Sequence, residues 1–319
     1  MKILQVLEEH TGSVAVGGIA GRSSGNIDNC TVNSSIVVTS QGSPDNYGNR
    51  AIGGICGDLQ SGNITNCTNN AVVTNNNGGS GSGGIVGIAR DAKHNIESCK
   101  NYGAVVSNGD KVGGICGVLA EGNNSSITTT ITKCKNTAII KGNTNVGGIA
   151  GRLGNHANAQ VDQCYNTGKV EATGHSDGTN SNVAGIVGTL NTYNYIKYCY
   201  NKGSVTATYG GASRNIGGIT GWMAANTTVK ECYNTGKASS TYSTYTYVGG
   251  IVGYKSGGTL TWNYCYKTNN QYAIGGNSKT GTNKTGQAYY STSGSECKSY
   301  WSSTYWNLTT TWPTLKNNP

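Results

Sequence analysis

The sequence predicts an all-β chain that folds as a right-handed parallel β-helix, a solenoid of about eight turns with three short strands per turn and a C-terminal cap. One observation is a repeat of about 33 residues, in which Gly-Gly-Ile-x-Gly, or Ala-Gly-Ile-x-Gly once, occurs eight times. Another is that one cysteine follows each copy. A third is that no stretch has apolar residues at helical spacing, while Gly, Asn and Thr are abundant, which excludes helical repeats of similar length.

Each repeat contains three β-branched runs bounded by Gly and Asn, which is the pattern of short strands. In the fifth repeat the first run starts at Val146 with Gly-Gly-Ile. The second run has Val161 three residues before its cysteine, and the third has Val170 six residues after it. The glycines are expected at a bend or where two backbones approach closely. The coil is expected to be right-handed, because parallel crossover connections almost always are.

The repeats are expected over residues 14–268. Residues 1–13 are predicted to be an N-terminal cap or an added start, because this segment has two acids and no long apolar core, and is therefore not an intact signal peptide. Residues 269–319 break the repeat and contain Trp301, Trp306 and Trp312. They are predicted to cap the solenoid, because its last turn would otherwise leave an unpaired strand edge and an open core.

The repeat cysteines are predicted to form a buried, mostly reduced column that acts as a set of small hydrophobic side chains. They are Cys30, Cys67, Cys99, Cys134, Cys164, Cys199, Cys232 and Cys265. The alternatives are metal ligands or disulfides. Zinc sites favour closely paired thiolates, and C-x-x-C does not occur in this chain. An odd total of 11 cysteines also argues against a regular ladder of bridges. We therefore predict no metal site and no cofactor.

Asparagine lies two residues after six of these cysteines, at Asn69, Asn101, Asn136, Asn166, Asn201 and Asn234. These side chains are predicted to turn corners in the left-handed conformation, which Asn tolerates best after Gly. Their amides could also bond up and down the stack. A ladder of amides that binds a ligand is the functional alternative.

The combination V-G-G-I-x-G … I-x-x-C-Y-N-T-G-x-V resembles the GLUG motif. That motif occurs in arrays on bacterial surface proteins, including adhesins and the non-catalytic parts of immunoglobulin A proteases. The clearest copies are Val146–Val170, Ile216–Lys237 and Val248–Tyr266, and the ending Trp306–Leu315 resembles a segment that closes such arrays. The resemblance implies a β-helix, but it implies a function only loosely, because the motif is scaffold.

Charge is sparse along the chain. The 23 Lys and Arg residues exceed the 14 Asp and Glu residues, which gives a net charge of +9. Because this charge is spread thinly and includes no basic run, nucleic-acid binding is not predicted. No apolar stretch approaches the ~20 residues that span a bilayer, so membrane insertion is not predicted either.

Enzymes that degrade polysaccharides also use β-helices, and glycoside hydrolysis needs two carboxylates roughly 5 to 10 Å apart. The acids of the repeat core, Glu97, Asp162 and Glu231, fall on nonadjacent turns, which is too far apart for such a pair. The loop 171–182 contains the only compact acid–histidine cluster, in a Gly- and Asn-rich setting typical of solvated polar residues. No catalytic residue is therefore assigned.

Tyrosine follows the cysteine directly in four consecutive repeats. The candidate binding residues are Tyr165, Tyr200, Tyr233 and Tyr266, with Tyr198 and Tyr264 beside them. If the cysteines point inward, their neighbours point outward by strand alternation, so an exposed stripe is expected. One hypothesis is a platform for glycan rings or a protein partner, since aromatic side chains with a polar tip suit interfaces. The other is aromatic packing that the C-terminal segment covers.

Together these observations predict a non-catalytic β-helix module of a bacterial cell-surface or secreted protein, used for adhesion or as a spacer. The expected partners are glycans or a surface protein, and the chain is expected to be extracellular and either monomeric or part of a longer chain. One alternative is a polysaccharide lyase or hydrolase. Another is the accessory region of a larger surface protease.

Overall fold

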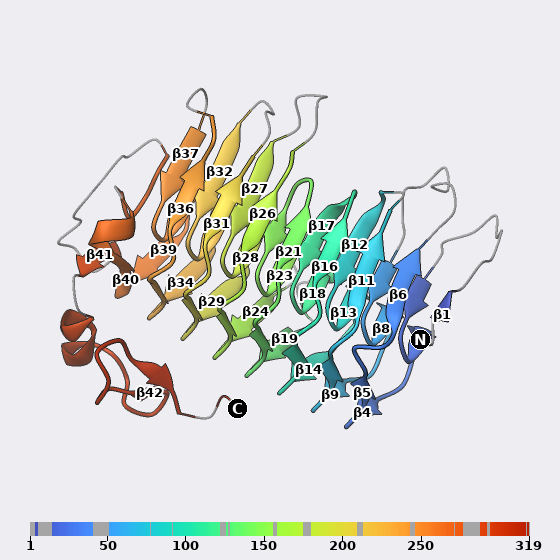
Figure 1. The fold of residues 1–319 in the computed structure, drawn as a ribbon. Coiled ribbons are helices and arrows are strands. Elements are labelled where there is room, and N and C mark those ends of the chain that lie inside the picture. The colour runs from blue at the N-terminus through green and yellow to red at the C-terminus, as the bar shows by residue number, and fades with distance from the viewer. Residues whose placement is uncertain are drawn as a thin grey trace.

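The computed structural model is a parallel β-helix, as the repeat predicts, and its strands stack from the N-terminal to the C-terminal end of the molecule (Figure 1). It describes residues 4–5, 15–40, 51–76, 78–90, 92–121, 126, 128–155, 158–174, 180–208, 213–242, 246–270, 272–276, 288–291, 294–316 and 318. Five parallel sheets of eight or nine strands run along the stack, because equivalent strands of successive repeats pair directly.

Each turn contains five short strands rather than the predicted three. The first complete turn consists of β2 (Ala15–Gly17), β3 (Ala20–Ser23), β4 (Ile27–Asp28), β5 (Thr31–Val32) and β6 (Val37–Ser40). Two of the three predicted runs bend in the middle: the Gly-Gly-Ile run gives β2 and β3, and the cysteine run gives β4 and β5. We number the sheets 1 to 5 in the order of these strands. A level is one set of equivalent strands, numbered 1 to 8 from the N-terminal end.

The strand bounds are as follows. Sheet 1 contains β2, β7 (Ala51–Gly53), β12 (Ser80–Gly83), β17 (Asp110–Gly113), β22 (Val146–Gly147), β27 (Ser181–Ala184), β32 (Arg214–Gly217) and β37 (Thr246–Gly249). Sheet 2 contains β3, β8 (Cys56–Leu59), β13 (Val86–Arg90), β18 (Cys116–Glu121), β23 (Ala150–Leu153), β28 (Val187–Leu190), β33 (Thr220–Met223) and β38 (Val252–Lys255). Sheet 3 contains β4, β9 (Ile64–Thr65), β14 (Asn95–Glu97), β19 (Thr129–Thr132), β24 (Ala159–Asp162), β29 (Tyr195–Lys197), β34 (Thr228–Lys230) and β39 (Thr259–Thr261).

Sheet 4 contains β5, β10 (Thr68–Asn69), β15 (Lys100–Asn101), β20 (Lys135–Asn136), β25 (Tyr165–Asn166), β30 (Tyr200–Asn201), β35 (Tyr233–Asn234), β40 (Asn263–Tyr266) and β41 (Ala288–Ser291). Sheet 5 contains β1 (Leu4–Gln5), β6, β11 (Val72–Asn75), β16 (Val105–Ser107), β21 (Ile140–Gly142), β26 (Val170–Ala172), β31 (Val205–Ala207) and β36 (Ala238–Ser240). The C-terminal part adds the short 3-10 helices η1 (Lys267–Asn269) and η2 (Ser295–Ser299). It ends in an antiparallel pair, β42 (Trp306–Asn307) and β43 (Thr314–Leu315).

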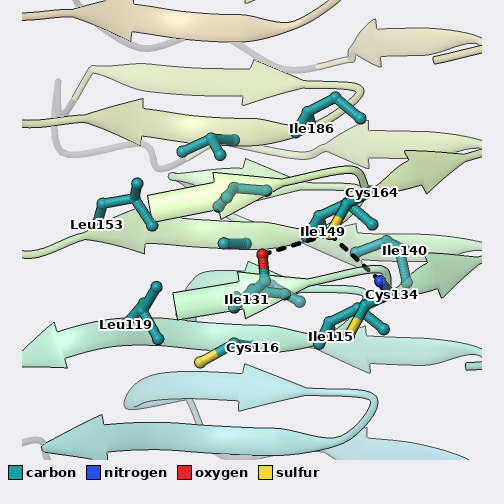
Figure 2. Packing of buried hydrophobic residues seen from close by; sticks show 14 of the residues in the cluster. Ile115, Cys116, Leu119, Ile131, Cys134, Ile140, Ile149, Leu153, Cys164 and Ile186 are labelled. Carbon is teal, nitrogen blue, oxygen red and sulfur yellow. Dashed lines mark hydrogen bonds between the residues drawn. The ribbon is translucent and has the colours of Figure 1, made fainter. Parts of the chain in front are cut away.

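The interior of the coil is filled by columns of like apolar side chains, one from each level (Figure 2). The isoleucines of the Gly-Gly-Ile motif are fully buried from Ile55 to Ile251, and Ile115, Ile149 and Ile186 follow one another up the stack. Burying each such side chain contributes roughly 1.5–3 kcal/mol. The hydrophobic contribution therefore grows with the number of levels, as in other solenoids.

The left-handed corner of the coil lies directly before the cysteine at levels 1 to 7 and directly before Asn263 at level 8. At the eight levels it is Asn29, Asn66, Ser98, Lys133, Gln163, Tyr198, Glu231 and Trp262, with φ between 50° and 54°. The prediction that the six asparagines after the cysteines turn a corner is wrong, because those residues lie within the strands of sheet 4. The residue type at the corner varies because backbone bonds between levels, such as Ser98 N–H to the Thr132 carbonyl at 3.0 Å, offset a strain of about 1–2 kcal/mol.

The predicted bonding of these asparagines along the stack is confirmed. The Nδ2 of Asn69 donates to Oδ1 of Asn101 at 2.9 Å, and the same bond recurs at every level up to Asn201 and Asn234, at 2.7 Å. Asn166 also holds the turn that leads to sheet 5, because its Nδ2 donates to the Gly168 carbonyl at 2.8 Å. All six side chains are fully buried, so they offer a ligand no accessible amide.

Close packing explains the glycines of the motif. A Cβ on Gly148 would overlap the carbonyl oxygen of Gly185 on the next level and the Asn166 amide. A Cβ on Gly151 would lie 2.5 Å from backbone atoms of Lys111 and Val112 in sheet 1. None of these motif glycines has a positive φ. The prediction of a close backbone approach is therefore confirmed, and the requirement is for space rather than for a left-handed backbone.

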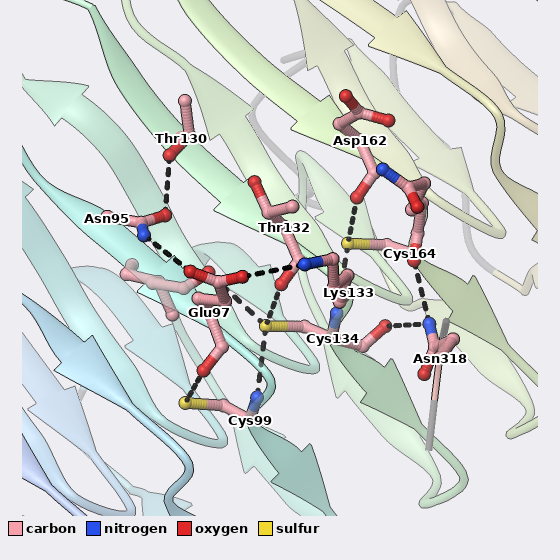
Figure 3. Close-up of polar contacts among 12 residues, drawn as sticks. Asn95, Glu97, Cys99, Thr130, Thr132, Lys133, Cys134, Asp162, Cys164 and Asn318 are labelled. Atoms are coloured by element: carbon pink, nitrogen blue, oxygen red, sulfur yellow. Dashed lines mark hydrogen bonds and ion pairs between the residues drawn. The ribbon is translucent and has the colours of Figure 1, made fainter. Parts of the chain in front are cut away.

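The cysteines form the predicted buried column through level 7, and Figure 3 shows three of them, Cys99, Cys134 and Cys164. The N–H of Cys99 donates to Sγ of Cys134 at 3.4 Å, and Sγ of Cys134 donates to the Thr132 carbonyl at 3.3 Å. Each thiol of the column therefore bonds within the stack. Burial raises the pKa of the Cys164 thiol well above its usual range. Cys30, at level 1, is only half-buried.

At level 8 the pairing differs from the prediction by two residues. Asn263 takes the cysteine position, because the N–H of Cys232 donates to its Oδ1 at 3.1 Å. Cys265 takes the asparagine position opposite Asn234, and Tyr264 rather than Tyr266 pairs with Tyr233. The expected places of Cys265 and Tyr266 are therefore wrong. A shift of two residues keeps the same faces buried, so strand alternation does not distinguish the two registers. The observed register places Leu260, and not the larger Trp262, in the buried apolar column.

We expect native protein at pH 8 to react with a thiol reagent first at Cys30, because this side chain reaches solvent. Cys134 and Cys164 should stay unlabelled, because burial keeps these thiols inaccessible and protonated. Peptide mass spectrometry after alkylation measures both, with denatured protein as the fully labelled reference. Equal labelling of Cys30 and Cys164 in the native state would contradict the buried column.

Candidate functional site

Four tyrosines form one column on the outer side of sheet 4, at levels 5 to 8: Tyr165, Tyr200, Tyr233 and Tyr264. The rings of Tyr165 and Tyr200 are parallel, with centroids 4.8 Å apart, and those of Tyr200 and Tyr233 are 5.0 Å apart. They stack at the strand spacing because in-register parallel strands place equivalent side chains above one another. Below Tyr165 the same position holds Lys135.

The C-terminal strap, which we define as residues 294–316 and Asn318, covers this column. It folds back from the C-terminal end of the stack toward its middle (Figure 1). Its three tryptophans surround the ring of Tyr233, with centroids 5.9 Å away for Trp301, 5.9 Å for Trp306 and 5.1 Å for Trp312. Trp306 is itself fully buried. The strap therefore forms a second apolar core outside the coil.

The prediction of an exposed tyrosine stripe is wrong at three positions, because the strap covers them. The exposed fraction is 6% for Tyr200, 0% for Tyr233 and 2% for Tyr264. The alternative hypothesis, aromatic packing under the C-terminal segment, is confirmed for these rings. Burial also raises the pKa of the Tyr233 hydroxyl well above its usual value.

The other three candidate tyrosines, Tyr165, Tyr198 and Tyr266, are half-buried at the edge of this cluster. Tyr198 stacks on Tyr305 of the strap with centroids 4.0 Å apart. Tyr266 meets Trp312 edge-on at 6.3 Å. A part for these three residues in ligand binding stays a prediction.

Hydrogen bonds fix where the strap lies. The hydroxyl of Tyr233 donates to the Pro313 carbonyl at 2.8 Å. At the far end, Nδ2 of Asn318 donates to the Gln163 carbonyl at 2.7 Å and approaches the Cys134 carbonyl at 3.4 Å (Figure 3). The strap thus ends between levels 4 and 5, where the column changes from tyrosine to lysine. This coincidence explains why the column holds tyrosine only at levels 5 to 8.

The acids of the repeat core make structural contacts. Glu97 accepts a bond from Lys133 at 3.0 Å, which lowers the pKa of this carboxyl group (Figure 3). Glu231 holds the strap, because it accepts the Ser302 N–H at 3.0 Å. Burial raises the pKa of Asp162. The three acids lie at levels 3, 7 and 5 of sheet 3 or beside it, so no two are on adjacent levels, as their spacing predicts.

Two further observations concern only the described part of the chain. No group of three or more His, Cys, Asp and Glu side chains there could hold a metal ion. No helix there is long and apolar enough to cross a bilayer. Residues 175–179, which include the histidine and the aspartate of the predicted polar cluster, lie outside the described residues.

A second surface, which the sequence analysis missed, lies on the outside of the coil where sheets 1 and 2 meet. We call this surface the outer corner and define it by eight residues. Sheet 1 and the residue just before β22 contribute Asn145, Asn182, Asn215 and Tyr247, and sheet 2 contributes Arg152, Thr189, Trp222 and Tyr254. Nδ2 of Asn215 donates to Oδ1 of Asn182 at 2.7 Å, and Nδ2 of Asn182 donates to Oδ1 of Asn145 at 3.1 Å. The two sheets are also joined, because Asn182 donates to Thr189 at 2.9 Å.

Amides and aromatic rings lie next to each other in the outer corner. Trp222, Tyr247 and Tyr254 are half-buried, and the two tyrosine rings are 5.2 Å apart. The Oδ1 of Asn215 is buried and has no hydrogen-bond partner. A sequence signal for this surface does exist, because asparagine directly precedes Val-Gly-Gly, Val-Ala-Gly or Ile-Gly-Gly in three consecutive repeats.

A comparison with protein families matches residues 142–171 to the GLUG motif. Residues 142–171 thus match a GLUG motif. The matched segment contains β22 to β25, so one GLUG copy corresponds to one turn of the coil. A solved structure with the same fold is a candidate immunoglobulin A1 protease from Bacteroides ovatus, at 20% identity and a TM-score of 0.51, covering 91% of this chain and 75% of that one. At this identity the likeness shows the fold alone. No curated protein sequence matches the chain.

Proposed function

We propose that this GLUG array is a non-catalytic module of a cell-surface or secreted protein, and that it acts in adhesion as a rigid rod with binding groups along its sides. The observation that carries this proposal is the continuity of the buried ladders. The asparagine ladder joins levels 2 to 7 without a break, and the cysteine column runs beside it.

Rigidity follows from the way in which each level is held. Backbone bonds in five sheets, the asparagine amides and the apolar columns all connect a level to both of its neighbours. Bending the rod would stretch several of these contacts together, because they lie on different sides of the coil. The strap adds a further connection on the outside, from Trp301 near level 8 to Asn318 beside level 5.

The outer corner is the contact surface that we assign to adhesion. A sugar ring can place its apolar face on Trp222 while its hydroxyl groups bond to the half-buried amides of Asn145 and Asn182, since an amide group can both donate and accept. The surface lies at levels 5 to 8 and repeats along the axis, so several sugars of one glycan could bind in succession. Each such contact is weak, and many copies on a surface would make the attachment firm.

Trp222→Ala should reduce the binding of protein-coated beads to mucin or to a neutral glycan array at least several-fold, because the largest aromatic face of the outer corner is lost. The matched control is Tyr193→Ala, which removes an exposed aromatic ring elsewhere in the chain. Bead binding under flow and melting temperature are the two measurements. Equal binding by both variants would exclude the outer corner as the contact surface.

The non-catalytic part of the proposal has its own test. Purified protein is incubated with polygalacturonate, alginate, xylan and mucin, and the products are separated by size. No shortened polysaccharide is expected. Release of oligosaccharides, lost on replacing an acid such as Glu121, would assign the chain to the polysaccharide-degrading enzymes instead.

A further inference from the structure

Five lysines that are far apart in the sequence lie close together on the outside of the coil. At levels 3 to 7, one lysine per level faces outward between sheet 4 and the start of sheet 5. Lys100 and Lys135 lie in β15 and β20 of sheet 4, Lys202 lies in the connection between the two sheets, and Lys169 and Lys237 directly precede β26 and β36 of sheet 5. We call these five residues the lysine band. The strands of sheet 5 that come after these lysines, β16, β21, β26, β31 and β36, stack directly on one another from level 3 to level 7 (Figure 1).

Strand alternation places all five side chains on the same side. They lie one, three or five residues after the cysteine of their level, whereas the positions two, four and six residues after it are largely buried. Lys169, Lys202 and Lys237 are exposed, and Lys100 and Lys135 are half-exposed. Successive levels are ~4.8 Å apart, so the band carries about one positive charge per ~4.8 Å along the axis.

The band keeps one lysine per level even where the strap intervenes. At levels 3 and 4, Lys100 and Lys135 occupy the position directly after the cysteine. At levels 5 to 7 tyrosines under the strap take that position, and the lysine stands two or four residues further along, beside the strap. Lys202 thus lies over the ring of Tyr200, with Nζ 5.2 Å from the centroid. The strap therefore leaves the band open.

Most of the band is not neutralised within the protein. Lys169 pairs with Glu171 at 2.5 Å, and Lys141 approaches the same carboxylate at 3.6 Å. Among the described residues, no carboxylate pairs with the other four lysines, Lys100, Lys135, Lys202 and Lys237. Because the net charge of the chain is only +9, more than a third of it is concentrated here.

Apolar and aromatic groups lie beside the charges at the lower levels. Tyr102 is 45% exposed and Ile139 is 53% exposed. The ammonium group of Lys135 lies 5.6 Å from the ring centroid of Tyr102. A partner that combines anionic groups with flat apolar faces would use both features.

We propose that the lysine band binds a linear anionic polysaccharide, with one carboxylate on each sugar, laid parallel to the axis of the β-helix. The rise of one sugar in an extended chain is close to the spacing of the levels, so each carboxylate meets a level that carries one lysine, which reaches it from one of three positions across the band. Double-stranded DNA carries one charge per about 1.7 Å, which one lysine per level matches poorly. The proposal goes beyond the adhesive role of the outer corner, because it concerns a different side of the coil.

The test compares polygalacturonate, which has one carboxylate per sugar, with the fully methyl-esterified polymer, which has the same backbone without charge. We expect the wild-type protein to bind polygalacturonate and not its ester, and to bind more weakly at 200 mM than at 50 mM NaCl. The variant Lys135→Gln, Lys202→Gln, Lys237→Gln should bind about tenfold more weakly, or ~1.4 kcal/mol. Lys169 is left intact because its ion pair could matter for folding.

The control variant Lys93→Gln, Lys255→Gln, Lys298→Gln removes the same charge from other parts of the surface and should change affinity less than about twofold. Melting temperatures of both variants confirm folding. An equal loss in the two variants would mean attraction by net charge alone and would overturn the proposal, as would no binding of polygalacturonate or alginate. Tighter binding of phosphatidylserine vesicles or of duplex DNA would assign the band to another polyanion. Cleavage of the polymer would contradict only the non-catalytic role of the module.

Discussion

Replacing Trp306 with alanine should detach the C-terminal strap and lower the free energy of unfolding by about 3–5 kcal/mol. Trp306 is fully buried between Trp301, at 4.5 Å, and the column rings of Tyr233 and Tyr200, at 5.9 and 6.4 Å. Alanine would leave a cavity where the strap and the coil meet. Thermal melting by circular dichroism and tryptophan fluorescence measures the loss.

Nitration separates loss of the strap from general instability. In the intact protein Tyr200 and Tyr233 should resist tetranitromethane, and in the Trp306→Ala variant both should react while the sheets stay folded. Lys298→Ala, at an exposed position of η2, is the matched control and should change neither melting nor nitration. Truncation before residue 294 should expose the same apolar column and cause aggregation. A soluble truncated protein with unchanged melting would show that the strap is only an appendage.

Asn166→Ala should lower the free energy of unfolding by about 2–4 kcal/mol, because it leaves several buried polar groups without one of their partners. In the native ladder Asn166 accepts from Asn136 at 2.7 Å, donates to Asn201 at 2.8 Å and closes the turn at Gly168 at both its N–H and its carbonyl. Alanine has no group that replaces these bonds. Chemical denaturation, followed by circular dichroism, measures the change.

The neighbouring residue provides the control for the ladder. Thr167 is exposed, and Thr167→Ala should change stability by no more than about 0.5 kcal/mol. Asn69→Ala should lower the free energy of unfolding less than Asn166→Ala does, because Asn69 is the first member of the ladder and bonds to only one other asparagine. If all three variants unfold at the same denaturant concentration, the ladder contributes nothing to stability.

Features that repeat with the sequence could be predicted, because a solenoid converts the spacing of residues along the chain into columns in space. The buried columns around Ile149 and Cys164 follow from the period and from strand alternation alone. The bonding between asparagines follows in the same way, because equal positions on adjacent levels lie one strand spacing apart.

Details within one repeat were predicted less well, because several backbone paths satisfy the same pattern. The left-handed corner is occupied by residues as different as Lys133 and Trp262, so the residue type does not reveal where the corner lies. The division of each turn into five strands depends on that corner and on the bend in Gly-Gly-Ile. At level 8 the two possible registers bury the same faces, and the fit of Leu260 in the core selects one.

Periodicity within and between repeats was enough to predict the β-helix, its buried columns and the outward direction of the tyrosines. Whether an outward side chain reaches solvent depends instead on what folds over it. Tyr233 is covered because Trp301 and Trp306, about 70 residues later, fold back onto it. The position of charges likewise depends on the tertiary structure. Lys202 and Lys237 are far apart in the sequence, yet the coil places them on neighbouring levels of the lysine band.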